Sequence, residues 1–135
     1  MTSDRPRFPV WFVSDCPPVD SGDAHGMIYR FVAEIPVVPN DFRSYFETGE
    51  RPLGLPCQRC GLSVFRDPRD IRELLQYLWR RYPGKTYGSH IVRRELKPAD
   101  GKLKATGSRG HHSWWAYEGV ERHASFEFVE TVEKS

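Results

Sequence analysis

The alternation of apolar and polar positions predicts a chain built mostly of short β-strands. Residues 27–34 (MIYRFVAE) are rich in β-branched and aromatic side chains and are bounded by Gly26 and Pro36, as a strand typically is. Later segments repeat this composition between turn-forming residues. The predicted strands cover residues 27–34, 62–65, 87–96, 102–106, 111–117 and 124–132, with a turn at 98–101.

Two stretches change to helical spacing. Asp67 is suited to cap a helix that begins at Pro68, and apolar side chains then recur every three to four positions, at Ile71, Leu74, Leu75 and Leu78. This pattern predicts a helix over residues 68–81. A shorter helix is predicted over 41–48 from Phe42, Tyr45 and Phe46. The prolines and glycines of residues 50–61 predict a loop.

These elements predict an α+β fold, with a twisted, mostly antiparallel sheet on which one long and one short helix pack. Residues 1–26 hold four prolines and one short apolar run, and they are expected to form an N-terminal arm or edge strand followed by a loop. Residues 27–135 are expected to form a single α+β domain, as the length of 135 residues favours.

Composition narrows the class of protein. A hydrophobic content of 39% with 13% aromatic residues excludes a disordered chain. No apolar run approaches the roughly 18 residues that a membrane span requires, so no membrane partner is expected. The first residues lack a basic segment followed by an apolar stretch, and a cytoplasmic protein is therefore expected.

Charge is distributed unevenly along the chain. The net charge is only +2, but residues 66–109 hold twelve Lys and Arg against five Asp and Glu. Such a segment can attract a nucleotide, a nucleic acid or an acidic protein, or it can simply form a solvated helix face. Support for nucleic acid is weak at this net charge.

The segment Cys57-Gln58-Arg59-Cys60-Gly61 has the spacing by which two thiolates hold one metal ion. A zinc site needs four ligands, so Cys16 and a histidine would have to complete it. A redox pair is a further alternative, although the strand predicted after Gly61 does not suit that chemistry. The odd cysteine count argues against a disulfide framework, and two reduced cysteines in a loop are the simplest interpretation.

A second cluster, residues 110–115 (GHHSWW), lies in a predicted strand. Alternation places His111, Ser113 and Trp115 on one face of that strand. Histidine titrates near neutral pH, and tryptophan offers a flat wall to a nucleobase or nicotinamide, so these residues are candidates for a cofactor site. The alternative is an ordinary core tryptophan beside a hydrogen-bonded histidine.

Several ordered segments resemble those of small uncharacterised bacterial proteins. The segments are Tyr29-Arg30, Gly61-Leu62-Ser63-Val64-Phe65 and Gly110-His111-x-Ser113-x-Trp115, and the similarity spans roughly residues 27–131. The layout is also similar, more distantly, to the ADP-ribosyltransferase-like fold. That resemblance implies NAD as a cofactor, with Arg30, Ser63 and Glu127 as catalytic residues. His111, from the Gly110-His111 segment, is predicted to be a catalytic residue of the same cleft.

The resemblance implies a specific part in the reaction for Arg30, Ser63 and Glu127. Arg30 would contact a phosphate or ribose, Ser63 would orient the ribose or a catalytic acid, and the Glu127 carboxylate would stabilise an oxocarbenium-like transition state. Ser113 and Trp115 would contact the cofactor, whereas Cys57 and Cys60 would hold zinc. The sequence thus favours a cleft of the ADP-ribosyltransferase-like or nucleotide-handling kind. The alternative is a non-catalytic interaction module, such as an inhibitor, an antitoxin-type partner or a regulator, which zinc bound by the cysteines would stabilise.

Overall fold

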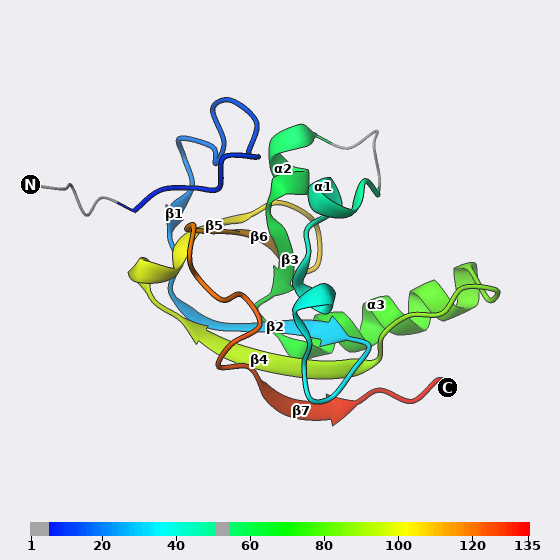
Figure 1. Ribbon diagram of the computed structural model, residues 1–135. Helices are drawn as coiled ribbons and strands as arrows, with labels where there is room; N and C mark the ends of the chain where they lie inside the picture. Colours follow the sequence, from blue (N-terminus) through cyan, green and yellow to red (C-terminus); the bar gives the residue numbers. More distant parts are fainter. Residues whose placement is uncertain (1–5, 51–54) are drawn as a thin grey trace, which may run out of the picture.

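The computed structural model describes residues 6–50 and 55–135, which form one seven-stranded antiparallel sheet with helices on it (Figure 1). The predicted α+β class is confirmed. The strand order is β1-β5-β6-β3-β2-β4-β7. The strands are β1 (Gly22–Asp23), β2 (Gly26–Val32), β3 (Leu62–Phe65), β4 (His90–Leu96), β5 (Gly101–Ala105), β6 (His111–Ala116) and β7 (Glu127–Thr131).

The two faces of the sheet build two separate cores, because successive side chains along each strand point in opposite directions. On β2, Ile28 and Val32 enter the larger core, while Tyr29 and Phe31 face the long helix. The larger core consists of Ala24, Ile28, Val32, Phe42, Leu62, Val64, Val92, Leu96, Leu103, Trp114 and Ala116. The smaller core consists of Phe65, Ile71, Leu75, Ile91 and Val132.

The long helix α3 (Pro68–Arg81) has the predicted bounds. The Asp67 side chain accepts a hydrogen bond from the Arg69 amide, which caps the first turn, and Pro68 occupies the position where no amide donor is needed. Ile71 and Leu75 are fully buried against the sheet. A capped, amphipathic helix of this length is therefore recognisable from local residues alone.

The predicted helix over 41–48 is instead two short pieces, the 3-10 helix η1 (Pro39–Phe42) and α1 (Tyr45–Thr48). Ser44 causes the break. Its hydroxyl accepts from the Glu47 amide while the Glu47 carboxylate accepts from the Ser44 amide, so that a new helix starts there. Phe42 packs into the larger core.

The loop predicted over 50–61 was wrong for its second half, where α2 (Pro56–Cys60) forms; residues 51–54 lie outside the described residues. Pro56 starts this single turn, and the Gly61 amide donates to the carbonyl of Gln58 at its end. A further short 3-10 helix, η2 (Pro98–Asp100), replaces the predicted turn at 98–101.

The last strand begins at Glu127 rather than at the predicted residue 124 because Arg94 holds the preceding loop. The Arg94 side chain is 9% exposed and donates to the carbonyl oxygens of Glu121 and Ala124 at 2.9 and 3.0 Å. It also pairs with Asp100 at 3.0 Å and lies 5.2 Å from the Trp114 ring. These bonds hold the carbonyls of the loop toward the Arg94 side chain, and the ladder between β4 and β7 begins only after them.

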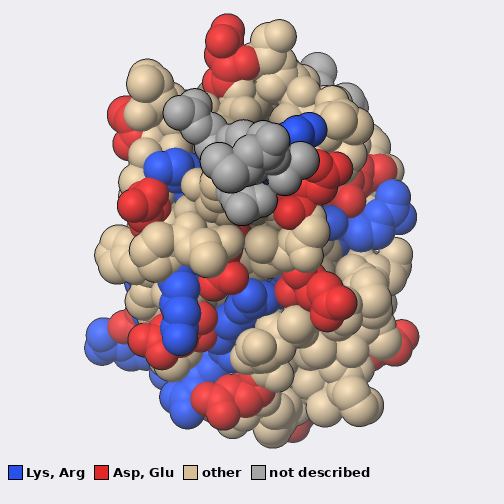
Figure 2. Space-filling view, turned by 60° about the vertical axis from the view of Figure 1, so that its left-hand side comes forward, with Lys and Arg blue, Asp and Glu red and all other residues tan. Residues whose placement is uncertain are grey.

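The N-terminal arm docks on the sheet. β1 pairs with β5, and the Arg7 carbonyl accepts from the Glu118 amide at 2.6 Å. The Phe8 ring packs against the Tyr117 ring in a tilted arrangement. On the face in Figure 2, basic and acidic side chains lie intermixed. None of the helices in the described ranges is long and apolar enough to cross a membrane.

A disulfide between Cys16 and Cys57 ties the arm to α2 across a sequence separation of 41 residues. The expectation of reduced thiols was therefore wrong for Cys57. The sequence could not reveal the bond because the partner cysteine lies in the arm, far from the paired Cys57 and Cys60, and only the docking of the arm brings it within reach.

Closing a loop of this length restricts the unfolded chain, so the double variant Cys16→Ser/Cys57→Ser should lose up to about 4 kcal/mol of unfolding free energy. Urea unfolding at pH 7 measures the loss. Dithiothreitol should lower the stability of the unaltered protein toward that of the variant and leave the variant itself unchanged. Equal reductant sensitivity of both proteins would contradict the assignment.

Candidate functional site

The sheet opens between β2 and β3, and Arg30 fills the opening. β2 pairs with β4 at seven positions, but the described register with β3 contains only Tyr29 opposite Phe65. Beside this pair, an Arg30 η nitrogen donates to the Ser63 carbonyl at 2.7 Å. The ε nitrogen and the other η nitrogen donate to the Asp41 carbonyl at 3.1 and 2.8 Å. The guanidinium thus donates to a β3 carbonyl that would ordinarily accept from the amide of a neighbouring strand.

Burial of this guanidinium lowers the pKa of Arg30 to about 10. The side chain remains protonated at neutral pH, and the Phe42 ring lies 5.5 Å from its centre. A charge held away from bulk water acts on its surroundings more strongly than an exposed one.

The opening leads into a cleft of about 530 Å³ between α3 and α2. Phe31, Ser63, Phe65 and His111 form its floor, since these side chains share the face on which α3 packs. Its walls are formed by Tyr45, Leu55, Gln58, Arg59, Leu74, Leu78 and Tyr87, and its rim by residues 106–109. Three arginines line the cleft (Arg30, Arg59 and Arg109), and no described residue with a carboxylate side chain does.

A chain of hydroxyl and imidazole groups runs along the floor. The His111 Nε2 lies 3.0 Å from the Ser63 Oγ, and its Nδ1 lies 3.1 Å from the Thr106 Oγ1. Thr106 in turn lies 2.7 Å from the Ser113 hydroxyl. Strand register explains the first contact. Ser63 is opposite Ser113 and Phe65 opposite His111, so Ser63 and His111 are diagonal neighbours on one face.

The hydrogen-bond partners define two states of the imidazole. If Thr106 accepts from Nδ1, then Nε2 is the acceptor for the Ser63 hydroxyl; if Thr106 donates to Nδ1, then Nε2 donates to Ser63. Thr106 can accept from Nδ1 while its own hydrogen goes to Ser113. This arrangement matches a nucleophile, a base and a group that orients the base.

The structure therefore brings together Arg30, Ser63 and His111, three of the four residues predicted as catalytic. The fourth, Glu127, does not line the cleft. It is exposed on β7, where it pairs with Arg93 at 2.6 Å, and β2 and β4 lie between it and β3. The sequence around Glu127 could not show this, because a glutamate in an edge strand has the same neighbours whether it is a catalytic residue or a surface charge.

The predicted cofactor contacts, Ser113 and Trp115, lie beneath the cleft rather than in it. They are 1% and 0% exposed, respectively. The Trp115 indole donates to the Cys57 carbonyl at 2.8 Å and so supports α2 from below. Gly61 permits this packing, because a β-carbon there would lie 3.0 Å from the Ser113 β-carbon. Ser113 and Trp115 therefore support residues of the cleft from below but do not line it.

The cysteines are arranged for structure rather than for the predicted zinc site. Cys57 is bonded to Cys16, and its sulfur is thus not a thiolate ligand. Cys60 is buried, which raises the pKa of its thiol. Within residues 6–50 and 55–135, no three His, Cys, Asp or Glu side chains gather in a group that could hold a metal ion.

Sequence reasoning missed Gln58, Arg59, Thr106 and Arg109. The first two lie on α2, for which a loop was predicted, and the last two on the hairpin between β5 and β6. Gln58 links the two groups by donating to the Thr106 carbonyl at 3.3 Å. The sequence did not reveal that these residues line one cleft, because α2 and the hairpin lie far apart in the chain.

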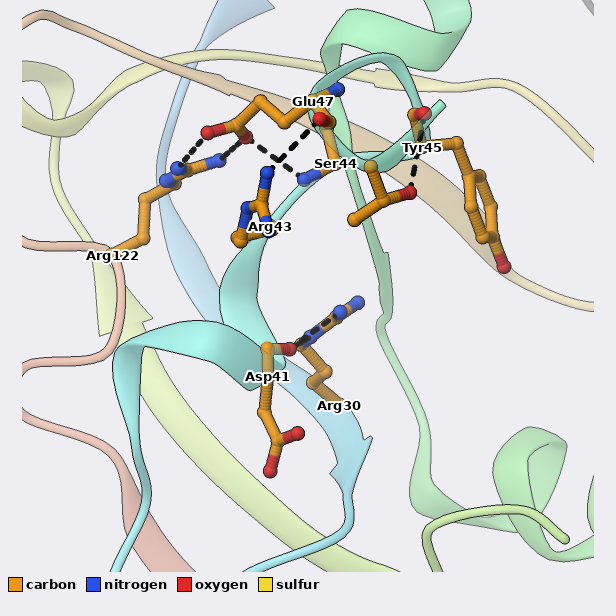
Figure 3. A network of polar contacts seen from close by, with 8 residues as sticks. Arg30, Asp41, Arg43, Ser44, Tyr45, Glu47 and Arg122 are labelled. Atoms are coloured by element: carbon orange, nitrogen blue, oxygen red, sulfur yellow. Dashed lines mark hydrogen bonds and ion pairs between the residues drawn. The ribbon is translucent and has the colours of Figure 1, made fainter. Parts of the chain in front are cut away.

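One wall depends on the polar network of Figure 3, which holds α1 and its Tyr45. The Glu47 carboxylate accepts from the Ser44 amide and from both terminal nitrogens of Arg122, at 2.6 and 2.9 Å. Burial of Glu47 raises its pKa, but these donors outweigh burial and lower the pKa below its ordinary value of 4.5. The network thus joins α1 to the loop before β7.

A group with a lowered folded-state pKa contributes stability above its unfolded pKa and loses it as the pH falls through the folded value. Glu47→Gln should therefore cost about 1–3 kcal/mol at pH 7, and the difference from the unaltered protein should shrink below about pH 4.5. Urea unfolding between pH 3 and pH 7 measures both. Glu73→Gln, an equal change at an exposed position of α3, is the matched control. A cost that does not vary with pH would contradict the ion pair.

Comparison with known proteins adds no relative, since neither a family model, nor a curated protein, nor a solved structure matches the chain.

Proposed function

We propose that the cleft binds a small phosphate-bearing ligand of the nucleotide class, such as ADP or NAD. The observation that carries this proposal is the charge of the lining, in which Arg30, Arg59 and Arg109 stand without a carboxylate among the described residues. Guanidinium groups bind phosphate oxygens with charge-assisted hydrogen bonds. A ligand of matching charge would supply the missing negative partner.

The uncharged part of the lining suits the rest of a nucleotide. Phe65 and Tyr87 offer aromatic surface, and Leu74 and Leu78 add an aliphatic wall. A flat base can lie against such surfaces while hydroxyl and amide side chains, such as those of Ser108 and Gln58, meet a ribose. A cleft of about 530 Å³ falls within the range of small-molecule sites.

The cleft supports nucleotide binding more than ADP-ribosyl transfer. An oxocarbenium-like transition state calls for a carboxylate, and Glu127 lies outside the cleft. We therefore propose the nucleotide-handling form of the function, without the transfer reaction that the resemblance implied.

Nucleic acid is a weaker candidate because half of the basic residues of segment 66–109 are already paired. Six of its twelve Lys and Arg residues make ion pairs within the protein, namely Arg69, Arg72, Arg93, Arg94, Lys102 and Lys104. The intermixed charges in Figure 2 likewise offer no continuous basic stripe on that face.

Isothermal titration with ADP and with NAD tests the proposal. Arg59→Gln and Arg109→Gln should each weaken the binding of ADP about ten-fold or more, as expected for losing a charged hydrogen bond. Arg80→Gln removes the same charge from an exposed position outside the lining and should bind like the unaltered protein.

Failure of both nucleotides to bind at millimolar concentration, or equal weakening by all three variants, would contradict the proposal. A protein that binds neither would favour the alternative of a non-catalytic partner-binding module, to be pursued by affinity capture with the intact chain.

A further inference from the structure

We propose that Ser63 is a nucleophile activated by His111, and that the cleft hydrolyses phosphoesters through a phosphoserine intermediate. The phosphoester class of the substrate rests on the proposed function, whereas the nucleophile rests on geometry alone. The Ser63 Oγ lies 3.0 Å from the His111 Nε2, and both side chains line the same cleft. This is the separation at which a histidine can remove a hydroxyl proton.

The second imidazole nitrogen has the orienting partner that such a base requires. Thr106 Oγ1 lies 3.1 Å from Nδ1, and its hydroxyl can donate a hydrogen bond to the Ser113 hydroxyl at 2.7 Å. Nδ1 then carries the imidazole proton, and Nε2 is left with a lone pair directed at Ser63. The Phe65 ring, edge-on at 5.4 Å, packs against the imidazole and restricts its rotation. Thr106 is thus a positioning residue.

Positive charge lies beside the backbone of the proposed nucleophile. The Arg30 guanidinium is 2.7 Å from the backbone carbonyl of Ser63 itself and faces the cleft. Its three bonds to the carbonyls of Ser63 and Asp41 hold it in place before any ligand arrives. A preorganised cation beside the nucleophile stabilises the extra charge of a phosphoryl group in transfer.

The proposed reaction has two balanced halves. The Ser63 Oγ attacks phosphorus, the bond from phosphorus to the leaving oxygen breaks, and the Ser63 proton passes to the His111 Nε2 and then to the leaving alkoxide. Water next attacks the phosphoserine and gives its proton to His111. The Oγ–P bond breaks, Ser63 recovers that proton, and inorganic phosphate leaves. No metal, oxidant or second substrate besides water enters the balance.

A fluorophosphonate reagent tests the nucleophile without knowledge of the natural substrate. Its phosphorus bonds to an activated serine oxygen as fluoride departs, and peptide mass spectrometry locates the adduct. We expect Ser63 to be labelled at least ten-fold faster than Ser125, which is exposed. Ser63→Ala should abolish labelling of its peptide, and His111→Gln should slow labelling of Ser63 at least ten-fold. Ser125→Ala should leave the Ser63 rate unchanged.

Thr106 provides a second test that survives a folding defect in the first. Thr106→Val should slow labelling of Ser63, whereas Thr106→Ser, which retains the hydroxyl, should restore most of the rate. Circular dichroism would establish that each variant is folded. Labelling of Ser63 no faster than Ser125 in the unaltered protein, or equal rates in the valine and serine variants, would overturn the proposed activation.

The substrate class is decided separately with two chromogenic esters. We expect release of p-nitrophenol from p-nitrophenyl phosphate, lost in Ser63→Ala, and little from p-nitrophenyl acetate; turnover of the acetate alone would overturn the phosphoester assignment. ADP should also slow the labelling of Ser63. If Ser63 is labelled but ADP neither binds nor protects, nucleotide binding fails while the nucleophile stands. If ADP binds but Ser63 is inert, the nucleophile fails alone.

Discussion

The donation from the Arg30 side chain to the backbone of Ser63 sets the geometry of the whole site. Neighbouring strands normally satisfy one another's amides and carbonyls, and a sheet that opens leaves these groups without partners. Here one guanidinium reaches across the opening and binds carbonyls of both β3 and η1. The sheet can therefore separate at β2 and β3 without exposing a buried acceptor, and the cleft begins at that separation.

Holding the charge of Arg30 away from water is costly, as its lowered pKa shows. Removing the guanidinium would nevertheless leave the carbonyls of Ser63 and Asp41 without these hydrogen bonds. Each buried carbonyl without a donor costs about 1–3 kcal/mol of stability. Two other arginines with little exposure pair with carboxylates, Arg94 with Asp100 and Arg122 with Glu47. Arg30 is bound by neutral carbonyls instead, which satisfies its hydrogen bonds but leaves its charge to act on the cleft.

Local signals were sufficient for much of the fold. The cap at Asp67 and the apolar stripe predict α3 with its observed ends, and the alternation of β3 and β6 predicts those strands, since all these signals act within a few residues. The errors arose where a side chain reached outside its own element. Ser44 divided a predicted helix by capping, and Arg94 held the loop before β7 out of the sheet.

The sequence by itself determined the class of the fold, its main elements, and the presence of Arg30, Ser63 and His111 on strands. Their meeting was decided by tertiary structure, because the order of β6, β3 and β2 in the sheet makes neighbours of residues 48 and 33 positions apart. The same order kept Glu127 away on an outer strand and buried Trp115 under α2. The Cys16–Cys57 bond was likewise decided by the docking of the arm, since periodicity and spacing describe single elements and not which distant elements pack together.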